Sequence, residues 1–270
     1  MTYSIVARDP ATGELGVAVQ SHFFGVGAIC PWVEPDVGAV ATQSIAEPSY
    51  GPRGLELMRA GRSAAEALAV LVAEDDDREQ RQVAFVDASG AIGVHTGERC
   101  IAEAGHATGA GWSVQANMMR DRGVPEAMAA AFSRAAGELA DRLLAALYAA
   151  EAAGGDIRGR QSACLLVASA DAKPWERAYD VRVDDHAEPL DELSRLVALH
   201  RAYRDGKAVN SELRFWRALE LAGEGRVDEA RALLAPVLTE HDGWALLLRR
   251  LPAVGHADQA TIDVLLGDRR

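Results

Sequence analysis

Thr2, the second residue of the chain, is the side chain whose position most directly suggests chemistry. We expect no leader segment, so that Thr2 follows an initiator methionine. Methionine aminopeptidases remove Met1 when the second residue is as small as Thr. The mature chain would then carry an α-amine and a hydroxyl on one residue, and the amine, which titrates near pH ~8, can deprotonate that hydroxyl. The alternative is that Thr2 is an ordinary threonine that opens a strand.

Polar residues also gather at the ends of several apolar strands. Ser4 shares a strand face with Thr2, Gln20–His22 end a second strand, Thr42–Ser44 end a third, and Gly154–Ser162 precede a fourth. Burying a polar group is costly unless it is hydrogen-bonded, so polar strand ends that meet at a common point indicate a site. Besides Thr2, the candidate site residues are Ser4, Ser21, Gln43, Ser44, Asn117, Asp156, Arg158 and Gln161.

These clusters also have structural interpretations, which stay open. Gln43 can simply satisfy neighbouring backbone groups in a sheet. Asp156 and Arg158 can form a structural ion pair that fixes a Gly-rich turn.

Composition and charge exclude several classes of function. The net charge is −12 and no block of Lys and Arg stands out, so we expect no nucleic acid or membrane partner. Three cysteines, Cys30, Cys100 and Cys164, are far apart, and the histidines are scattered, so we predict neither a disulfide framework nor a metal site. No dinucleotide or phosphate-binding motif is complete, and we predict no cofactor. Without a signal peptide or an apolar run of membrane-spanning length, we expect a cytoplasmic protein.

Hydrophobic patterning predicts strands and helices in alternating blocks. In the first nine residues, Tyr3, Ile5 and Ala7 fall on one strand face and Thr2, Ser4 and Val6 on the other. We predict strands over 1–9, 14–21, 37–44, 80–87, 91–96, 111–118, 162–169 and 178–183. We predict helices over 54–60, 63–73, 125–134, 139–153 and 190–203.

The order of these elements predicts an α+β fold. Antiparallel hairpins interrupted by two pairs of helices suit a four-layer αββα sandwich, in which the helix pairs cover the outer faces of two stacked sheets. From about Asn210 the pattern is helical throughout. We therefore predict a sandwich domain over 1–206 and a small all-α appendage over 207–270. Residues 225–231 are tetratricopeptide-like, but one helix pair is weak evidence for a repeat array.

Four motifs in order resemble the family called domain of unknown function 1028 (DUF1028). They are Thr2–Asp9, Gly38–Gln43, Pro48–Leu55 and Gly154–Ala163, and the resemblance extends over about residues 1–199. That family is grouped with the N-terminal nucleophile (Ntn) hydrolases, whose fold is the αββα sandwich. The helical tail resembles the short C-terminal region of some members that is described as peptidoglycan-binding-like.

The resemblance implies that the first residue of the mature chain, here Thr2, attacks an amide carbonyl. We predict hydrolysis of the C–N bond of a small-molecule amide or ureide, with Thr2, Asn117, Asp156 and Arg158 in catalytic roles. Asn117 and backbone N–H groups near Gln43–Ser44 would bind the oxyanion, and Asp156 with Arg158 would position the amine or hold a substrate carboxylate. The predicted substrate-binding residues are Ser4, Ser21, Gln43, Ser44 and Gln161.

Two alternatives belong to other classes of function. The first is a non-catalytic ligand-binding protein on the same scaffold, whose tail could bind cell-wall fragments. The second is that the tail only completes an oligomer interface, and we expect a homo-oligomer in either case.

Overall fold

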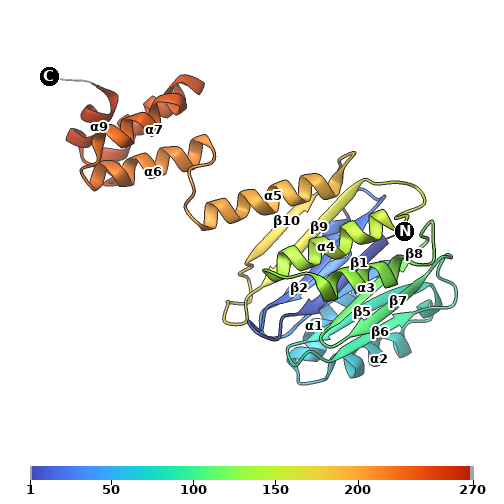
Figure 1. Ribbon diagram of the computed structural model, residues 1–270. Helices are drawn as coiled ribbons and strands as arrows, with labels where there is room; N and C mark the ends of the chain where they lie inside the picture. The colour runs from blue at the N-terminus through green and yellow to red at the C-terminus, as the bar shows by residue number, and fades with distance from the viewer. Residues whose placement is uncertain (1, 268–270) are drawn as a thin grey trace. The chain divides into compact units, whose positions relative to one another are not determined.

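The computed structural model describes residues 2–267 (Figure 1). The chain divides into two compact units, one ending at Val197 and one beginning at Ala198. This division falls within the helix Pro189–Arg204, whereas the sequence placed the domain boundary after that helix, between Gly206 and Lys207. Among the described residues, no helix has both the length and the apolar character that crossing a bilayer requires.

The first unit contains two antiparallel sheets. The strands are β1 Thr2–Arg8, β2 Leu15–Ser21, β3 Pro31–Glu34, β4 Gly38–Ser44, β5 Arg81–Asp87, β6 Ile92–Thr96, β7 Gly105–Gly109, β8 Trp112–Asn117, β9 Ser162–Ala168 and β10 Tyr179–Val183. Six of them form a sheet in the order β10-β9-β2-β1-β8-β7, and four form a second sheet in the order β3-β4-β5-β6. The chain start, β1, therefore lies in the interior of the larger sheet.

Helices cover the outer faces of both sheets. In this unit they are α1 Tyr50–Arg59, α2 Ala64–Glu74, α3 Val124–Arg134 and α4 Leu139–Ala152, followed by α5 Pro189–Arg204, at which the unit ends. The described residues also contain three short 3-10 turns, at Val26–Ala28, Arg78–Gln80 and Leu251–Val254.

Alternation along β1 decides which side chains enter which layer. Tyr3, Ile5 and Ala7 pack in one apolar cluster with α3 and α4, and Val6 points the other way into the layer between the sheets. On the far side, α1 and α2 pack on Phe85 and other outward residues of the smaller sheet. The predicted α+β fold, a four-layer αββα sandwich, is confirmed (Figure 1).

Three details differ from the sequence prediction. β3 was not among the predicted strands, because prolines at 31 and 35 bracket it, but it forms an edge strand, where the missing N–H of Pro31 costs no essential ladder bond. β7 was not predicted, because its sequence, GHATG, lacks an apolar alternation. α1 begins at Tyr50, four residues before the predicted start, since Pro52 lies in the first turn, where backbone N–H groups have no partner within the helix.

The second unit is a helical bundle with its own core. Its helices are α6 Ser211–Gly223, α7 Val227–Glu240, α8 Gly243–Arg250 and α9 Gln259–Leu266. Phe215, Leu234, Leu248 and Ile262 are buried together in one cluster. The Phe215 ring contacts the Trp244 ring at a centroid distance of 5.1 Å. The expected all-α appendage is thus present as a packed unit.

Candidate active site

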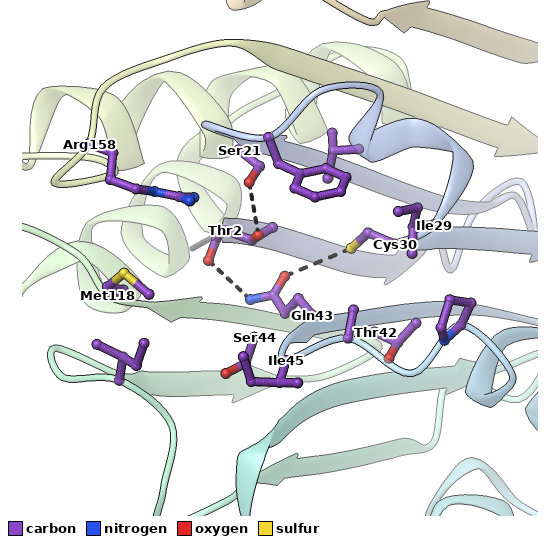
Figure 2. Close-up of a pocket in the computed structure, with 15 residues that line it drawn as sticks. Thr2, Ser21, Ile29, Cys30, Thr42, Gln43, Ser44, Ile45, Met118 and Arg158 are labelled. Atoms are coloured by element: carbon purple, nitrogen blue, oxygen red, sulfur yellow. Dashed lines mark hydrogen bonds between the residues drawn. The ribbon is translucent and has the colours of Figure 1, made fainter.

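Strand ends from both sheets meet at one cavity of about 450 Å³ (Figure 2). The antiparallel register places Thr2, at the start of β1, beside Asn117, at the end of β8. The end of β2 lies on the other side of β1. The described residues that line the cavity are Thr2, Ser21, Phe23, Val26, Ile29, Cys30, Thr42, Gln43, Ser44, Ile45, Ala46, Pro48, Ile101, Met118 and Arg158.

Thr2 presents its hydroxyl to this cavity from an almost fully buried position. Its side chain belongs to the layer between the sheets, and the residue is 6% exposed. Its Oγ1 donates a hydrogen bond to Ser21 Oγ at 3.1 Å. Because β1 and β2 are rigid neighbours in the sheet, this bond limits the directions that the Thr2 hydroxyl can take.

The backbone carbonyl of Thr2 is held by two side-chain amides. Gln43 Nε2 donates to this oxygen at 3.1 Å, and Asn117 Nδ2 donates to it at 3.3 Å. Both amides also donate to Gln82 Oε1, at 2.7 Å from Gln43 and 3.0 Å from Asn117. The smaller sheet, through Gln43 and Gln82, thereby fixes the backbone of the first described residue of the larger sheet.

A second pair of side chains orients the Gln43 amide. Ser4 Oγ donates to Gln43 Oε1 at 2.6 Å, and Gln115 Nε2 donates to Ser4 Oγ at 2.6 Å. Because the oxygen of Gln43 is fixed in this way, its nitrogen must face Thr2. We call the five residues Ser4, Gln43, Gln82, Gln115 and Asn117 the amide network; all are buried.

Two lining residues have left-handed backbone conformations. Ser44 has φ = 73° and Met118 has φ = 59°, and among the described residues only Asp36 is a further non-glycine with positive φ. This region is unfavourable for residues with a Cβ, and such strain persists where the surroundings enforce it, often at functional sites. Two of the three cases lie at this one cavity.

The loop before β9 brings a positive charge to the cavity. Asp156, whose side chain is fully buried, accepts hydrogen bonds from the backbone N–H of His22 and of Arg158, both at 2.9 Å. The Arg158 guanidinium also contacts the Asp156 carboxylate, at 3.3 Å from Nη2 to Oδ2. Asp156 thus fastens this loop to the end of β2, and Arg158 lines the cavity.

The predicted site residues fall into three groups. Those that line the cavity are Thr2, Ser21, Gln43, Ser44 and Arg158, and those that lie behind it are Ser4, Asn117 and Asp156. Gln161 is not among the lining residues, and its Nε2 donates to Asp185 Oδ1 at 3.1 Å.

Sequence reasoning missed several contributors to the site. Gln82 and Gln115 belong to the amide network, and the signal that could have found them is the one used for Gln43, a polar residue at an inward strand position. Most of the apolar lining, including Phe23, Ile45 and Ile101, comes from loops that carry no motif.

Neither a metal nor a reactive thiol is indicated. No group of three or more His, Cys, Asp or Glu residues in the described part of the chain could hold a metal ion. Cys30 lines the cavity, but burial raises the pKa of its thiol to about 12, so it is not a thiolate at neutral pH.

Comparison with known proteins identifies the family. The model of a family of unknown function, DUF1028, matches residues 2–193. Protein SPO2555 from Silicibacter pomeroyi, whose crystal structure is assigned to DUF1028, is 32% identical, with a TM-score of 0.68 over 74% of this chain and 88% of that chain. The Anbu protein (ancestral β-subunit) from Yersinia bercovieri is 10% identical, with a TM-score of 0.36 over 73% of this chain and 96% of that one, which does not indicate a shared fold. No curated protein matches the chain. The chain belongs to the DUF1028 family.

Proposed function

We propose that this protein is an N-terminal nucleophile amidohydrolase that cleaves the C–N bond of a small amide, with Thr2 as the nucleophile. The observation that carries the proposal is the position of Thr2: it opens β1, lines the cavity and has its carbonyl clamped by two amides. Met1 lies outside the described residues, and its removal is part of the proposal.

The reaction follows from having an amine and a hydroxyl on one residue. The α-amine of Thr2 takes the hydroxyl proton as Oγ1 attacks the substrate carbonyl carbon. The C–N bond breaks, the proton passes to the departing nitrogen, and an acyl ester remains on Oγ1. Water then attacks this ester, releases the acid and returns a proton to Oγ1. In this scheme Ser21 orients the hydroxyl, which it contacts at 3.1 Å.

The oxyanion of the tetrahedral intermediate needs a donor aimed into the cavity. Asn117, the side chain predicted for this role, already donates to Thr2 O and Gln82 Oε1, so we assign it to positioning Thr2. We assign the oxyanion to the backbone N–H of Ser44. The N–H of Thr42 donates to the carbonyl of Cys30, the residue just before β3. Backbone N–H groups alternate sides along a strand, so the N–H of Ser44 points to the same side as that of Thr42, where β3 no longer provides a partner.

The first test combines the mass of the purified protein with the effect of replacing Thr2. We expect the intact mass and N-terminal sequence to show a chain that begins at Thr2. A screen of small amides by mass spectrometry should then find a substrate whose turnover is lost in Thr2→Ala and kept in Thr2→Ser, which preserves the amine and the hydroxyl. Full activity in Thr2→Ala, or retention of Met1 in protein from a host with a working aminopeptidase, would refute the proposal.

A further inference from the structure

The cavity has an unusual charge for this protein. Arg158 is its one charged member among the described lining residues, and none of them is a carboxylate. The chain as a whole has a net charge of −12, so its surface repels anions in general. In an acidic protein, a cation that lines a cavity attracts the anionic group of a ligand to that place.

Arg158 is held in a way that suits carboxylate binding. Its guanidinium contacts the buried Asp156 carboxylate through Nε at 3.4 Å and Nη2 at 3.3 Å, while its side chain stays 40% exposed. Asp156 therefore fixes the plane of the group. A guanidinium has five N–H donors in a rigid fork, so contact with one carboxylate is compatible with contact to a second. Because Asp156 partly neutralises the charge, we expect a moderate gain from the second carboxylate.

Most of the other residues that line the cavity are apolar. Among the apolar lining residues, Val26 is buried and Ile29 is half-buried, whereas Phe23, Ile45 and Ile101 are 47%, 51% and 49% exposed. Large apolar side chains left open to solvent around a cavity indicate an apolar ligand group.

The nucleophile lies between these two regions. In Figure 2, Arg158 lies on one side of Thr2, and Ile29 and Cys30 lie on the other. A substrate whose carbonyl carbon meets Thr2 Oγ1 can thus place an apolar group toward Ile29 and an anionic group toward Arg158. The scissile bond would lie between the two groups.

We infer that the substrates are N-acyl amino acids, with the acyl chain in the apolar part of the cavity and the amino-acid carboxylate on Arg158. This inference rests on the proposed function, because it takes Thr2 to be the reacting group. Attack at the acyl carbonyl would leave the acyl chain on Thr2 and release the amino acid from the Arg158 side. A cavity of about 450 Å³ falls within the range of small-molecule sites, roughly 300–1,000 Å³, and suits an acyl chain of medium length.

Calorimetric titration of the Thr2→Ala protein with three matched ligands tests the substrate class without turnover. N-octanoylglycine has both groups, N-methyloctanamide lacks the carboxylate, and N-acetylglycine lacks the long chain. We expect N-octanoylglycine to bind at least about tenfold more tightly than either of the other two ligands. Compared with N-methyloctanamide it gains one charge-assisted contact, and compared with N-acetylglycine it buries several more methylene groups. Equal affinity for N-methyloctanamide would overturn the carboxylate assignment, and equal affinity for N-acetylglycine would overturn the acyl-chain assignment.

A pair of arginine variants, made in the same Thr2→Ala background, assigns the carboxylate to its partner. Arg158→Gln should weaken N-octanoylglycine about tenfold and leave N-methyloctanamide unchanged. Arg160→Gln is the matched control, because Arg160 pairs with Glu151 and Glu188 and is not among the lining residues. An equal loss in both variants would show that Arg158 does not bind the carboxylate. If Arg158→Gln fails to fold, the ligand comparison above still decides the substrate class.

Turnover by the unaltered protein separates this inference from the proposed function. Release of glycine from N-octanoylglycine, measured by mass spectrometry, supports both. Binding with the expected preferences but without glycine release, in protein that begins at Thr2, would refute the hydrolase and retain the ligand class. Thr2-dependent cleavage of N-methyloctanamide at an equal rate would retain the hydrolase and refute the ligand class.

Discussion

Replacing Gln43 and Gln20 by methionine should change stability in opposite directions, although both residues are buried glutamines in the same sandwich. Gln43 is 1% exposed and Gln20 is 0% exposed. The side chain of Gln43 is fully engaged in the amide network. Gln20 lies on the helix-facing side of β2, and neither Nε2 nor Oε1 has a hydrogen-bond partner among the described residues.

The magnitudes follow from counting what each substitution leaves unpaired. Gln43→Met removes the acceptor of Ser4 Oγ, while Thr2 O and Gln82 Oε1 each keep a bond from Asn117. One buried orphan costs about 1–3 kcal/mol, and with the weakened network we expect a loss of about 2–4 kcal/mol. Gln20→Met removes two unpaired polar atoms from an apolar layer and should stabilise by about 1–2 kcal/mol.

Differential scanning calorimetry of the two variants measures the contrast. For a unit of this size each kcal/mol shifts Tm by about 2–4 °C, so Gln43→Met should lower the Tm of the sandwich by about 4–16 °C and Gln20→Met should raise it. Denaturant unfolding at 25 °C provides the free energies directly. If both substitutions destabilise equally, or if Gln43→Met changes stability by less than about 0.5 kcal/mol, the network does not stabilise the fold as argued.

Three further predictions concern other parts of the sandwich. A Cβ on Gly93 would lie 2.6 Å from the carbonyl oxygen of Ala64, so Gly93→Ala should cost about 2 kcal/mol or more in denaturant unfolding, while Gly123→Ala, with open space around it, should cost far less. Burial raises the pKa of Asp87, but hydrogen bonds from its own turn and from Ala64 N–H lower it by more, so the net pKa is lowered. Stability from Asp87 should therefore be present above about pH 4 and lost as pH falls through the lowered pKa, and an Asp87→Asn variant should lose less between pH 4 and 2; parallel curves would contradict this. Iodoacetamide at pH 8 should alkylate Cys30 only after unfolding, because burial raises its pKa to about 12, and rapid labelling of the native thiol would show that the cavity activates it.

The sequence predicted the layers of the fold well because burial imposes a period of two on strands. The alternation of Tyr3, Ile5 and Ala7 against Thr2, Ser4 and Val6 was read directly, and the two faces do enter different layers. The failures, β3 and β7, are edge strands, which bury less and so need no apolar pattern. β7 forms because β8 supplies a partner across the short turn at residues 110–111, and five residues without apolar alternation do not show that pairing.

The same periodicity explains the uneven outcome at the site. Thr2, Ser21, Gln43 and Ser44 are polar residues at strand ends, and all four line the cavity. Gln161 directly precedes Ser162, whose side chain faces the interior and bonds to the Phe23–Val26 loop. Successive side chains of a strand point to opposite faces, so the Gln161 side chain points away from that interior and bonds to Asp185. A polar residue near a strand end indicates a site, but the face of the strand on which it lies decides whether its side chain reaches that site.

The layer between the sheets has two chemically different ends, and this difference bears on function. Toward one end it is filled by apolar side chains such as Val17 and Leu166, and toward the Thr2 end it is filled by the amide network. An apolar layer would stabilise the sandwich without requiring any hydrogen-bond geometry, so stability alone does not account for the amides. Within the network, Asn117 Oδ1 is the one side-chain oxygen or nitrogen without a partner among the described residues. A network this nearly satisfied holds its members rigidly, and what it holds is the carbonyl of Thr2. The buried polar groups of the network are costly to place in a core, and they converge on Thr2. Their position therefore supports Thr2, rather than another residue of the cavity, as the residue whose geometry the fold fixes.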